Sequence, residues 1–549
     1  MKKTIVLVLV LALGLVTEAA KADFTFGTPT SLGQTVNNSY NDFNPCISAD
    51  GLSLYFISNR TGGIGGTGMY DGCDIWVTTR ETTDDPWGIP ENLGPTINSP
   101  VGEFGVSISS DGLSLYLDTL PPGVTGAEDL YVSTRVTTDD EWGIPVNLGL
   151  TVNSSGDDCY VNISADELAL YFVSNRSGGY GGYDLWVTKR ETTSDPWGTP
   201  VNLGPMVNSS AGEGHPGISP DRRIFFFVSS SGYGNEDIWM TRRATTNDEW
   251  GEPVNLGSTI NSSVWEGFPN VSADGSTLYF RYSQTGRYQG GDIWQVPIIP
   301  IVDFNGDGKV NGREVLIMAE CLGTNDSVCD IGPMPWGDGV VDLNDLRVLA
   351  EYIGADLADP TLLAHWALDE TEGMAAADSA GENDATVMGN AAWQPTGGRV
   401  NGALEFDGTT FIVADFVLSP AAPFSVFAWV KGATPGQVTL SQRGGVNWLM
   451  TDPATGALMT ELKSGGRLGC PLYSETVITD GDWHGIGLTW DGSNRRLYAD
   501  DVVVAEDTQS GLADCLGGLT IGCGNTMALG TFFTGLIDDV RIYNRAVKP

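Results

Sequence analysis

The residues best suited to chemistry form one acidic loop near the middle of the chain, residues 303–314. The loop reads Asp-Phe-Asn-Gly-Asp-Gly-Lys-Val-Asn-Gly-Arg-Glu, with Gly308 at the sixth position, where a ligand loop must turn sharply. Oxygen donors stand at positions 1, 3, 5 and 12, and position 7 offers its main-chain carbonyl: Asp303, Asn305, Asp307, Glu314 and Lys309. Calcium takes six to eight oxygen ligands at about 2.3–2.6 Å, and this spacing wraps a loop around one ion. The loop therefore predicts a calcium site, with a solvated turn as the alternative.

A second acidic stretch lies further along the chain, at residues 338–345. Both stretches run into an apolar segment that we expect to be helical, residues 315–319 after the first and 346–353 after the second. In the second stretch, a loop of the same kind would place carboxylates at ligand positions 5 and 12 and one between them. These carboxylates are Asp338, Asp345 and Asp342.

The two loop–helix units of residues 303–354 resemble a type I dockerin, a small α-helical calcium module whose family partner is a cohesin. The first loop follows the family pattern, but the second departs from it, because Met334 and Trp336 stand where ligand positions 1 and 3 should fall. Asp330 would supply the first ligand only if the chain after it bulged out. The resemblance thus implies one well-formed calcium loop and leaves the second open.

Partner choice in dockerins depends on residues near loop positions 10 and 11. Here these residues are Gly312-Arg313 in the first loop and Leu343-Asn344 in the second. They differ from the small hydroxyl pair that is common in the family. The dockerin resemblance therefore implies a cohesin-like partner, but the residues at positions 10 and 11 do not support one.

The N-terminal half of the chain is built from a repeated unit. An Asp-aliphatic-aromatic triplet recurs in steps of 55, 55, 53 and 55 residues, beginning at Asp74, Asp129, Asp184, Asp237 and Asp292. Each unit reads as four short strands separated by Gly, Asp and Asn turns. A period near 50 residues with four strands per unit is typical of propeller blades. The five units predict a five-bladed β-propeller over residues 24–297, whereas a linear array would leave two sheet edges open.

These units resemble the TolB-like, WD-like propeller repeats. The matching segments include Ser-Ala-Asp at 164–166, Leu-Tyr-Phe-Val-Ser-Asn-Arg at 170–176 and Tyr-Asp-Leu-Trp at 183–186. The resemblance covers about half of the chain and implies the propeller fold. It says little about activity, because one scaffold of this kind hosts many functions.

One carboxylate recurs in every unit, five residues after a repeated Asn and next to the first strand: Asp42, Glu103, Asp158, Glu213 and Glu266. First strands line the channel of a propeller, so glycoside hydrolysis by two unlike carboxyl groups is one interpretation, with Glu213, Glu266 and Glu103 as weak catalytic candidates. A cation on the axis is a second, because converging carboxylates repel. We favour a structural role, because these residues repeat whereas catalysis needs carboxylates that differ. His215 breaks the symmetry and is expected in a loop.

The C-terminal segment, residues 362–549, predicts a second β domain. Apolar and other residues alternate at 424–430 and 484–490, and Asp-Gly turns at 407–408 and 491–492 separate the runs. This pattern fits a β-sandwich of the jelly-roll type. The whole chain is therefore expected to be mainly β, with one small helical module. His365 and His484 fall on strands, where we expect them in the core.

This segment resembles the laminin-G-like branch of the concanavalin A-like lectin/glucanase superfamily. The resemblance rests on Gly-Ala-Leu-Glu-Phe-Asp-Gly at 402–408, Trp-His at 483–484, Leu-Tyr-Ala-Asp-Asp at 497–501 and Gly-Leu-Ile-Asp-Asp-Val-Arg-Ile-Tyr-Asn-Arg at 535–545. It implies a domain that binds glycans or proteins, often with calcium. The nearest matches to the metal-binding positions of the family are Asp378, Asn383 and Asp538, and turn formation is the alternative role for them.

Composition narrows the class of partner. The 549 residues contain 28 Lys and Arg against 69 Asp and Glu, a formal charge of −41. Nucleic-acid binding depends on clustered cations that displace counterions, so this balance excludes it. Only three His are present, which leaves little material for most acid–base or zinc chemistry.

The N-terminus predicts export. Lys2 and Lys3 precede an apolar run from Ile5 to Val16 and an Ala-Lys-Ala cleavage pattern at 20–22, as in a signal peptide over residues 1–22. No stretch is long enough to be a typical transmembrane helix. Eight Cys suit an oxidising compartment. Cys321 with Cys329, and Cys515 with Cys523, are possible pairs, although the pairing cannot be read from the sequence.

Two functional classes follow. The first is a secreted or cell-surface calcium-binding protein whose jelly roll binds carbohydrate or a surface glycoconjugate. The second is an extracellular glycoside hydrolase, active in polysaccharide catabolism, with its site in the propeller. A purely structural envelope protein is a third and weaker interpretation. We favour the binder over the enzyme, because the propeller carboxylates are symmetric and no close Glu pair of the glucanase kind is found in the jelly roll.

Overall fold

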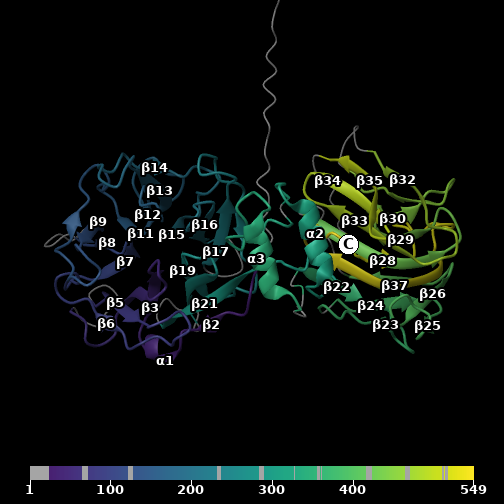
Figure 1. Ribbon diagram of the computed structural model, residues 1–549, viewed down its shortest axis with the longest axis horizontal. Coiled ribbons are helices and arrows are strands. Elements are labelled where there is room, and N and C mark those ends of the chain that lie inside the picture. Colours follow the sequence, from purple (N-terminus) through teal and green to yellow (C-terminus); the bar gives the residue numbers. More distant parts are fainter. Residues whose placement is uncertain are drawn as a thin grey trace, which may run out of the picture. The chain divides into compact units, whose positions relative to one another are not determined.

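The computed structural model describes residues 24–64, 72–120, 128–230, 236–283, 290–326, 328–354, 359, 361–381, 383–415, 423–463, 470–509, 512 and 517–549. The expected signal peptide and Cys515 lie outside these residues. The chain divides into two compact units (Figure 1). One unit is Met1–Pro300 with Met334–Gly339, and the other is Ile301–Pro333 with Val340–Pro549.

The first unit is a five-bladed β-propeller, as the repeat predicts. Blades 1 to 4 are antiparallel four-stranded sheets in chain order. Their strands are β3 (Asp42–Ile47), β4 (Ser53–Ser58), β5 (Asp74–Thr79) and β6 (Glu91–Asn92); β7 (Glu103–Ile108), β8 (Ser114–Thr119), β9 (Asp129–Thr134) and β10 (Val146–Asn147); β11 (Asp158–Ile163), β12 (Ala169–Ser174), β13 (Asp184–Lys189) and β14 (Val201–Asn202); β15 (Glu213–Ile218), β16 (Ile224–Ser229), β17 (Asp237–Arg242) and β18 (Val254–Asn255).

The fifth blade joins the two ends of the propeller segment. The fifth repeat unit contributes three strands to this blade: β19 (Trp265–Val271), β20 (Thr277–Ser283) and β21 (Gly291–Pro300). Two N-terminal strands, β1 (Phe24–Phe26) and β2 (Thr30–Ser31), both pair with β21, and helix α1 (Gly33–Val36) then leads into blade 1. This closure satisfies an edge that a linear array would expose.

Burial explains why the blade strands read as continuous apolar runs. All six residues of β12 and all six of β16 are buried, because neighbouring blades cover both faces of each sheet. The arginine directly after the third strand stacks on the repeated Trp in each of the first four blades, at 4.2–4.3 Å from the ring centroid. Such cation–π contacts on a Trp face stabilise the outer edge of each blade.

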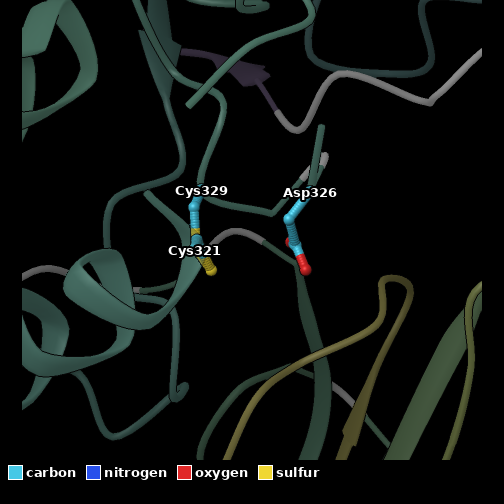
Figure 2. Close-up of side chains that lie close together, drawn as sticks. All are labelled: Cys321, Asp326 and Cys329. Atoms are coloured by element: carbon cyan, nitrogen blue, oxygen red, sulfur yellow. A yellow bond between two sulfur atoms is a disulfide. The ribbon is translucent and has the colours of Figure 1, made fainter. Parts of the chain in front are cut away.

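Two short helices open the second unit, α2 (Gly312–Cys321) and α3 (Leu343–Tyr352). Each begins with a capping box, in which Asn311 and Glu314, or Asp342 and Asp345, satisfy the free N–H groups of the first turn. A disulfide joins Cys321, at the end of α2, to Cys329, which confirms one of the two candidate pairs (Figure 2).

The rest of this unit is a jelly roll of two eight-stranded antiparallel sheets. We call the first the β28 sheet; in order it contains β25 (Ala392–Gln394), β26 (Ala403–Asp407), β37 (Thr534–Tyr543), β28 (Phe424–Gly432), β33 (His484–Trp490), β34 (Asn494–Ala499) and β35 (Val502–Thr508), with β22 (Leu362–Trp366) also on β37. The second contains β23 (Ala375–Ala376), β24 (Ala385–Met388), β27 (Phe411–Ala414), β36 (Leu519–Ile521), β29 (Val438–Gln442), β30 (Asn447–Thr451), β31 (Ala457–Thr460) and β32 (Leu472–Val477).

The inner faces of the two sheets form one core, in which Trp366 and Trp448 are fully buried. The expectation that both histidines belong to this core is wrong. His365 lies between two buried residues of β22, so alternation turns its ring to the other face, where Nε2 lies 2.7 Å from Asp539. His484, the first residue of β33, bonds the carboxylates of Asp480 and Asp500.

Candidate functional site

The acidic loop between β21 and α2 closes around the carboxylate of Asp303, which is 3% exposed. Its Oδ1 accepts hydrogen bonds from the N–H groups of Gly306 (2.8 Å) and Asp307 (3.2 Å), and its Oδ2 accepts one from Gly308 (2.8 Å). Gly306 and Gly308 both have positive φ angles, 70° and 80°, which a side chain would disfavour. The glycines therefore let the loop fold back over the carboxylate of Asp303.

Glu314, at loop position 12, is fully buried, and only one of its two carboxylate oxygens accepts a hydrogen bond. Its Oε2 accepts a hydrogen bond from Asn311 N–H (2.6 Å), whereas its Oε1 has no partner. Asp303, Asp307 and Glu314 each place an oxygen within 4.8 Å of the others. Burial raises the pKa of both Asp303 and Glu314, and the neighbouring carboxylates add to this effect. A buried glutamate with one unpaired oxygen, in a cluster with two more carboxylates, fits a divalent cation, which would offset this repulsion.

Two further loop residues belong to the same cluster. Asn305 donates from Nδ2 to Asp307 (3.2 Å), and its Oδ1 accepts the N–H of Asp307 (2.9 Å). The N–H of Lys309 donates to Asp307 Oδ1 (2.9 Å). The structure thus brings together the carboxylates at positions 1, 5 and 12 and holds the intervening residues by local hydrogen bonds. All-oxygen donors of this kind suit calcium better than zinc or copper.

The second candidate loop is arranged differently. Asp345 Oδ1 accepts the N–H groups of Ile331 (2.6 Å) and Gly332 (2.8 Å), and its Oδ2 accepts that of Asp342 (2.6 Å). Asp342 in turn caps α3 through the N–H of Asn344. These two carboxylates therefore already serve backbone groups. Asp338 is exposed and lies in the Met334–Gly339 stretch, which belongs to the propeller unit and not to that of Asp342 and Asp345.

Trp336 accounts for the departure of this stretch from a ligand loop. Its ring is 3% exposed and packs in a propeller core cluster, with its centroid 5.8 Å from that of Phe24. Its Nε1 donates to Asp221 Oδ2 (2.8 Å). The other group of potential metal ligands among the described residues, Cys321, Asp326 and Cys329, already contains the disulfide.

The five repeated carboxylates of the propeller share one role. Each is at most 3% exposed and accepts the N–H of the residue four positions earlier at 2.5–3.1 Å. Arg60 also pairs with Asp42 at 2.5 Å, and Arg176 with Asp158. Through this hydrogen bond, each carboxylate holds the segment that connects two blades against the first strand of the second blade. The groups of described side chains close enough to share a cation include none of these five.

The propeller axis is filled by side chains. A bulge in the first strand turns Asn44, Tyr160, His215 and Phe268 inward with positive φ angles. His215 stacks on Phe268 with centroids 3.6 Å apart, and Tyr160 packs edge-on against His215 at 4.7 Å. The expectation of a loop position for His215 is wrong, because it lies within β15. Burial and then the charge of Arg281 lower its pKa to about 3, so it stays neutral.

One propeller carboxylate makes stability depend on pH. Burial raises the pKa of Glu103 from 4.5 to about 8. Between these values the folded chain holds a proton that the unfolded chain has released, so the free energy of unfolding falls as pH rises through this window. We expect Glu103→Gln to reduce this fall, measured by urea unfolding at pH 5 and 8.5. An exposed control is Glu91→Gln; an equal fall in wild type and Glu103→Gln would contradict the prediction.

The jelly-roll candidates separate into two places. Asp378 Oδ2 accepts both the N–H and the side-chain amide of Asn383, at 3.1 and 3.0 Å. Asp538, on β37, instead accepts the N–H groups of Arg399 (2.7 Å) and Val400 (2.8 Å) through Oδ2, while its buried Oδ1 has no partner. Burial raises the pKa of Asp538 to about 7. Asp378 and Asn383 therefore shape one turn, and Asp538 holds another.

No sequence pattern identifies the side chains that hold the acidic loop. Tyr543, at the end of β37, donates from its hydroxyl to the carbonyl of Gly306 (2.6 Å). Arg545 donates to the carbonyl of Asp303 and forms an ion pair of 2.8 Å with Asp359, in which both side chains are 3% exposed. These contacts join residues more than 180 positions apart. Only the tertiary fold brings them to the loop.

Comparison with known proteins gives one family match. Residues 406–549 match the family Laminin_G_3, described as the concanavalin A-like lectin/glucanases superfamily. No curated protein matches the chain. Within the described residues, the structure has no helix both long and apolar enough to span a membrane.

Two solved structures among those that match the chain have low overall similarity to it. One is domain 4 of AbnA, a GH43 extracellular arabinanase from Geobacillus stearothermophilus, in complex with arabinotriose; it is 21% identical, covers 34% of this chain and 94% of that chain, and has a TM-score of 0.28. The other is Trypanosoma rangeli sialidase, which is 14% identical, covers 94% of this chain and 83% of that chain, and has a TM-score of 0.30.

Proposed function

We propose that this chain is an exported modular protein that binds calcium through residues 303–314 and carbohydrate through its jelly roll, with the propeller as its scaffold. The observation that carries the calcium assignment is the fully buried, unpartnered Oε1 of Glu314 beside Asp303 and Asp307. An unpaired charge in such a place is costly unless a cation accompanies it. Carbohydrate binding is supported by the family description of residues 406–549.

Export is supported by two features. The pattern at residues 1–22 is that of a signal peptide. The Cys321–Cys329 disulfide suits an oxidising compartment. Docking to a cohesin-like protein receives less support, because Arg313, at a position that the dockerin resemblance links to partner choice, is paired with Asp501 at 2.5 Å. That pair ties the first loop to the jelly roll of the same chain.

The calcium assignment is tested by isothermal titration calorimetry on the full chain after removal of divalent ions with a chelator. We expect one calcium ion per chain in the loop, and a loss of affinity of about tenfold or more in Glu314→Gln, because the charge of the ligand set determines calcium affinity.

The matched control is Glu320→Gln, which changes an exposed glutamate on the same helix. It should bind calcium as the wild type does. Equal affinity in Glu314→Gln and wild type would rule out the loop as the site, and the absence of calcium binding to wild type would remove the calcium assignment.

A further inference from the structure

A cleft of about 200 Å³ lies within the second unit, between the acidic loop and the outer face of the β28 sheet. Phe427 and Trp429 from β28 line its floor, and Arg541 from β37 lines its side. Asp307, Arg313 and Asp501 form the opposite wall. The cleft is small for a ligand pocket, since such pockets usually measure roughly 300–1,000 Å³, so it suits one small unit of a larger molecule.

The floor of the cleft consists of two aromatic rings, each of which lies over a glycine of the neighbouring strand. Trp429 is paired across the sheet with Gly485, and Phe427 with Gly487. A Cβ at Gly487 would lie 2.4 Å from ring carbons of Phe427, and one at Gly485 would lie 3.2 Å from the ring of Trp429. The two glycines therefore allow both rings to lie down on the sheet, where each stays half-buried. An exposed side chain, Arg399, lies over the Trp429 ring at 4.9 Å, so a ligand that stacks on this face would displace the Arg399 guanidinium.

The wall of the cleft combines donors and acceptors with nearly balanced charge. Arg313 pairs with Asp501 (2.5 Å), and Arg541 pairs with Asp539 (2.9 Å). Asp307 is the remaining carboxylate, and it is also one of the proposed calcium ligands. With calcium in the loop, the cleft would thus carry little net charge. A sugar ring matches this surface, because it offers an apolar C–H face to an aromatic ring and hydroxyl groups that both donate and accept.

We propose that this cleft is the carbohydrate-binding site of the chain, that it takes one neutral sugar unit, and that calcium in the acidic loop sets the shape of one wall. This inference rests on the proposed function and names its site. The coupling is physical, since the loop that supplies Asp307 and Arg313 is attached to β37 through the hydroxyl of Tyr543 and the carbonyl of Gly306. Coupling of this kind is reciprocal, so sugar should also strengthen calcium binding.

The test uses the full chain, fluorescently labelled, on an array that carries neutral, sialylated and sulfated oligosaccharides. We expect the wild type to bind a subset of the neutral glycans in calcium and to lose most of this binding in EDTA. Trp429→Ala should weaken binding by about tenfold or more, as truncation of a central aromatic contact commonly does, and Trp429→Phe should restore part of it.

The matched control is Tyr473→Ala, which removes an aromatic side chain that is 55% exposed on β32 of the other sheet. It should bind as the wild type does. Circular dichroism and the melting temperature of Trp429→Ala establish that this variant is folded; if it is not, Arg313→Ala, at an exposed pair on the wall, replaces it with the same expected direction.

The possible results distinguish a failure of the cleft assignment from a failure of the proposed carbohydrate binding. Neutral-glycan binding that survives Trp429→Ala and Arg313→Ala keeps the proposed function and overturns the cleft. Binding to sialylated or sulfated glycans alone overturns the neutral ligand, and binding that is equal in calcium and EDTA overturns the coupling. A wild type that binds nothing on the array while calorimetry still detects calcium overturns carbohydrate binding and, with it, the cleft.

Discussion

Calcium added at about 1 mM to the chelator-treated protein is expected to raise the melting temperature of the second unit by about 5–15 °C. With a dissociation constant of roughly 1–10 μM, binding to the folded state alone adds about 3–4 kcal/mol, and each kcal/mol moves the midpoint of a unit of this size by about 2–4 °C. The expected direction follows from the buried Oε1 of Glu314, which has no hydrogen-bond partner, in a cluster with the carboxylates of Asp303 and Asp307.

Differential scanning calorimetry of the full chain measures this shift, because the two compact units can give separate transitions. The transition of the propeller should move little. Glu314→Gln should remove most of the calcium-dependent shift, and magnesium at the same concentration should reproduce little of it, because magnesium demands a tighter octahedral set of ligands. A calcium shift that is as large in Glu314→Gln as in wild type would contradict the assignment of the loop.

Arg545→Met is expected to destabilise the second unit by about 3–5 kcal/mol, which is the usual cost of removing one partner from a buried ion pair. The side chains of Arg545 and Asp359 are each 3% exposed, and Arg545 also donates to the carbonyl of Asp303. The variant would leave the carboxylate of Asp359 buried without its cation. Chemical unfolding in calcium-containing buffer, followed by the fluorescence of the jelly-roll tryptophans, measures the change.

Arg313→Met is the matched control for this variant. Arg313 also joins the acidic loop region to the jelly roll, but its ion pair with Asp501 is about half exposed on both sides. Exposed ion pairs contribute only about 0–1 kcal/mol, so the control should remain close to the wild type in stability. Equal losses in the two variants would mean that burial of the Arg545 pair does not determine its contribution.

The sequence determined the features of this protein that depend on neighbouring residues or on repetition. Five copies of one unit predicted five blades, because each unit contains the turns and apolar strands of a complete sheet. The proposed ligand residues between Asp303 and Glu314 could be named from the sequence, because a calcium loop takes its donors from fixed positions within one short segment. The two helices were also expected from local apolar runs at 315–319 and 346–353, but the structure begins them three residues earlier, at Gly312 and Leu343, directly after their capping residues.

Features that depend on contacts between distant residues became visible only in the folded chain. Closure of the ring by β1 and β2 on β21 joins segments more than 250 residues apart. His215 lies in the plugged axis because of a bulge whose backbone conformation no spacing rule reveals. Trp336 stands where the second loop should have a ligand, yet its indole is not a metal ligand and is buried in the propeller unit, which the sequence spacing does not reveal. The cleft beside Trp429 exists because chain segments far apart in sequence pack together, and a linear pattern contains no record of that packing.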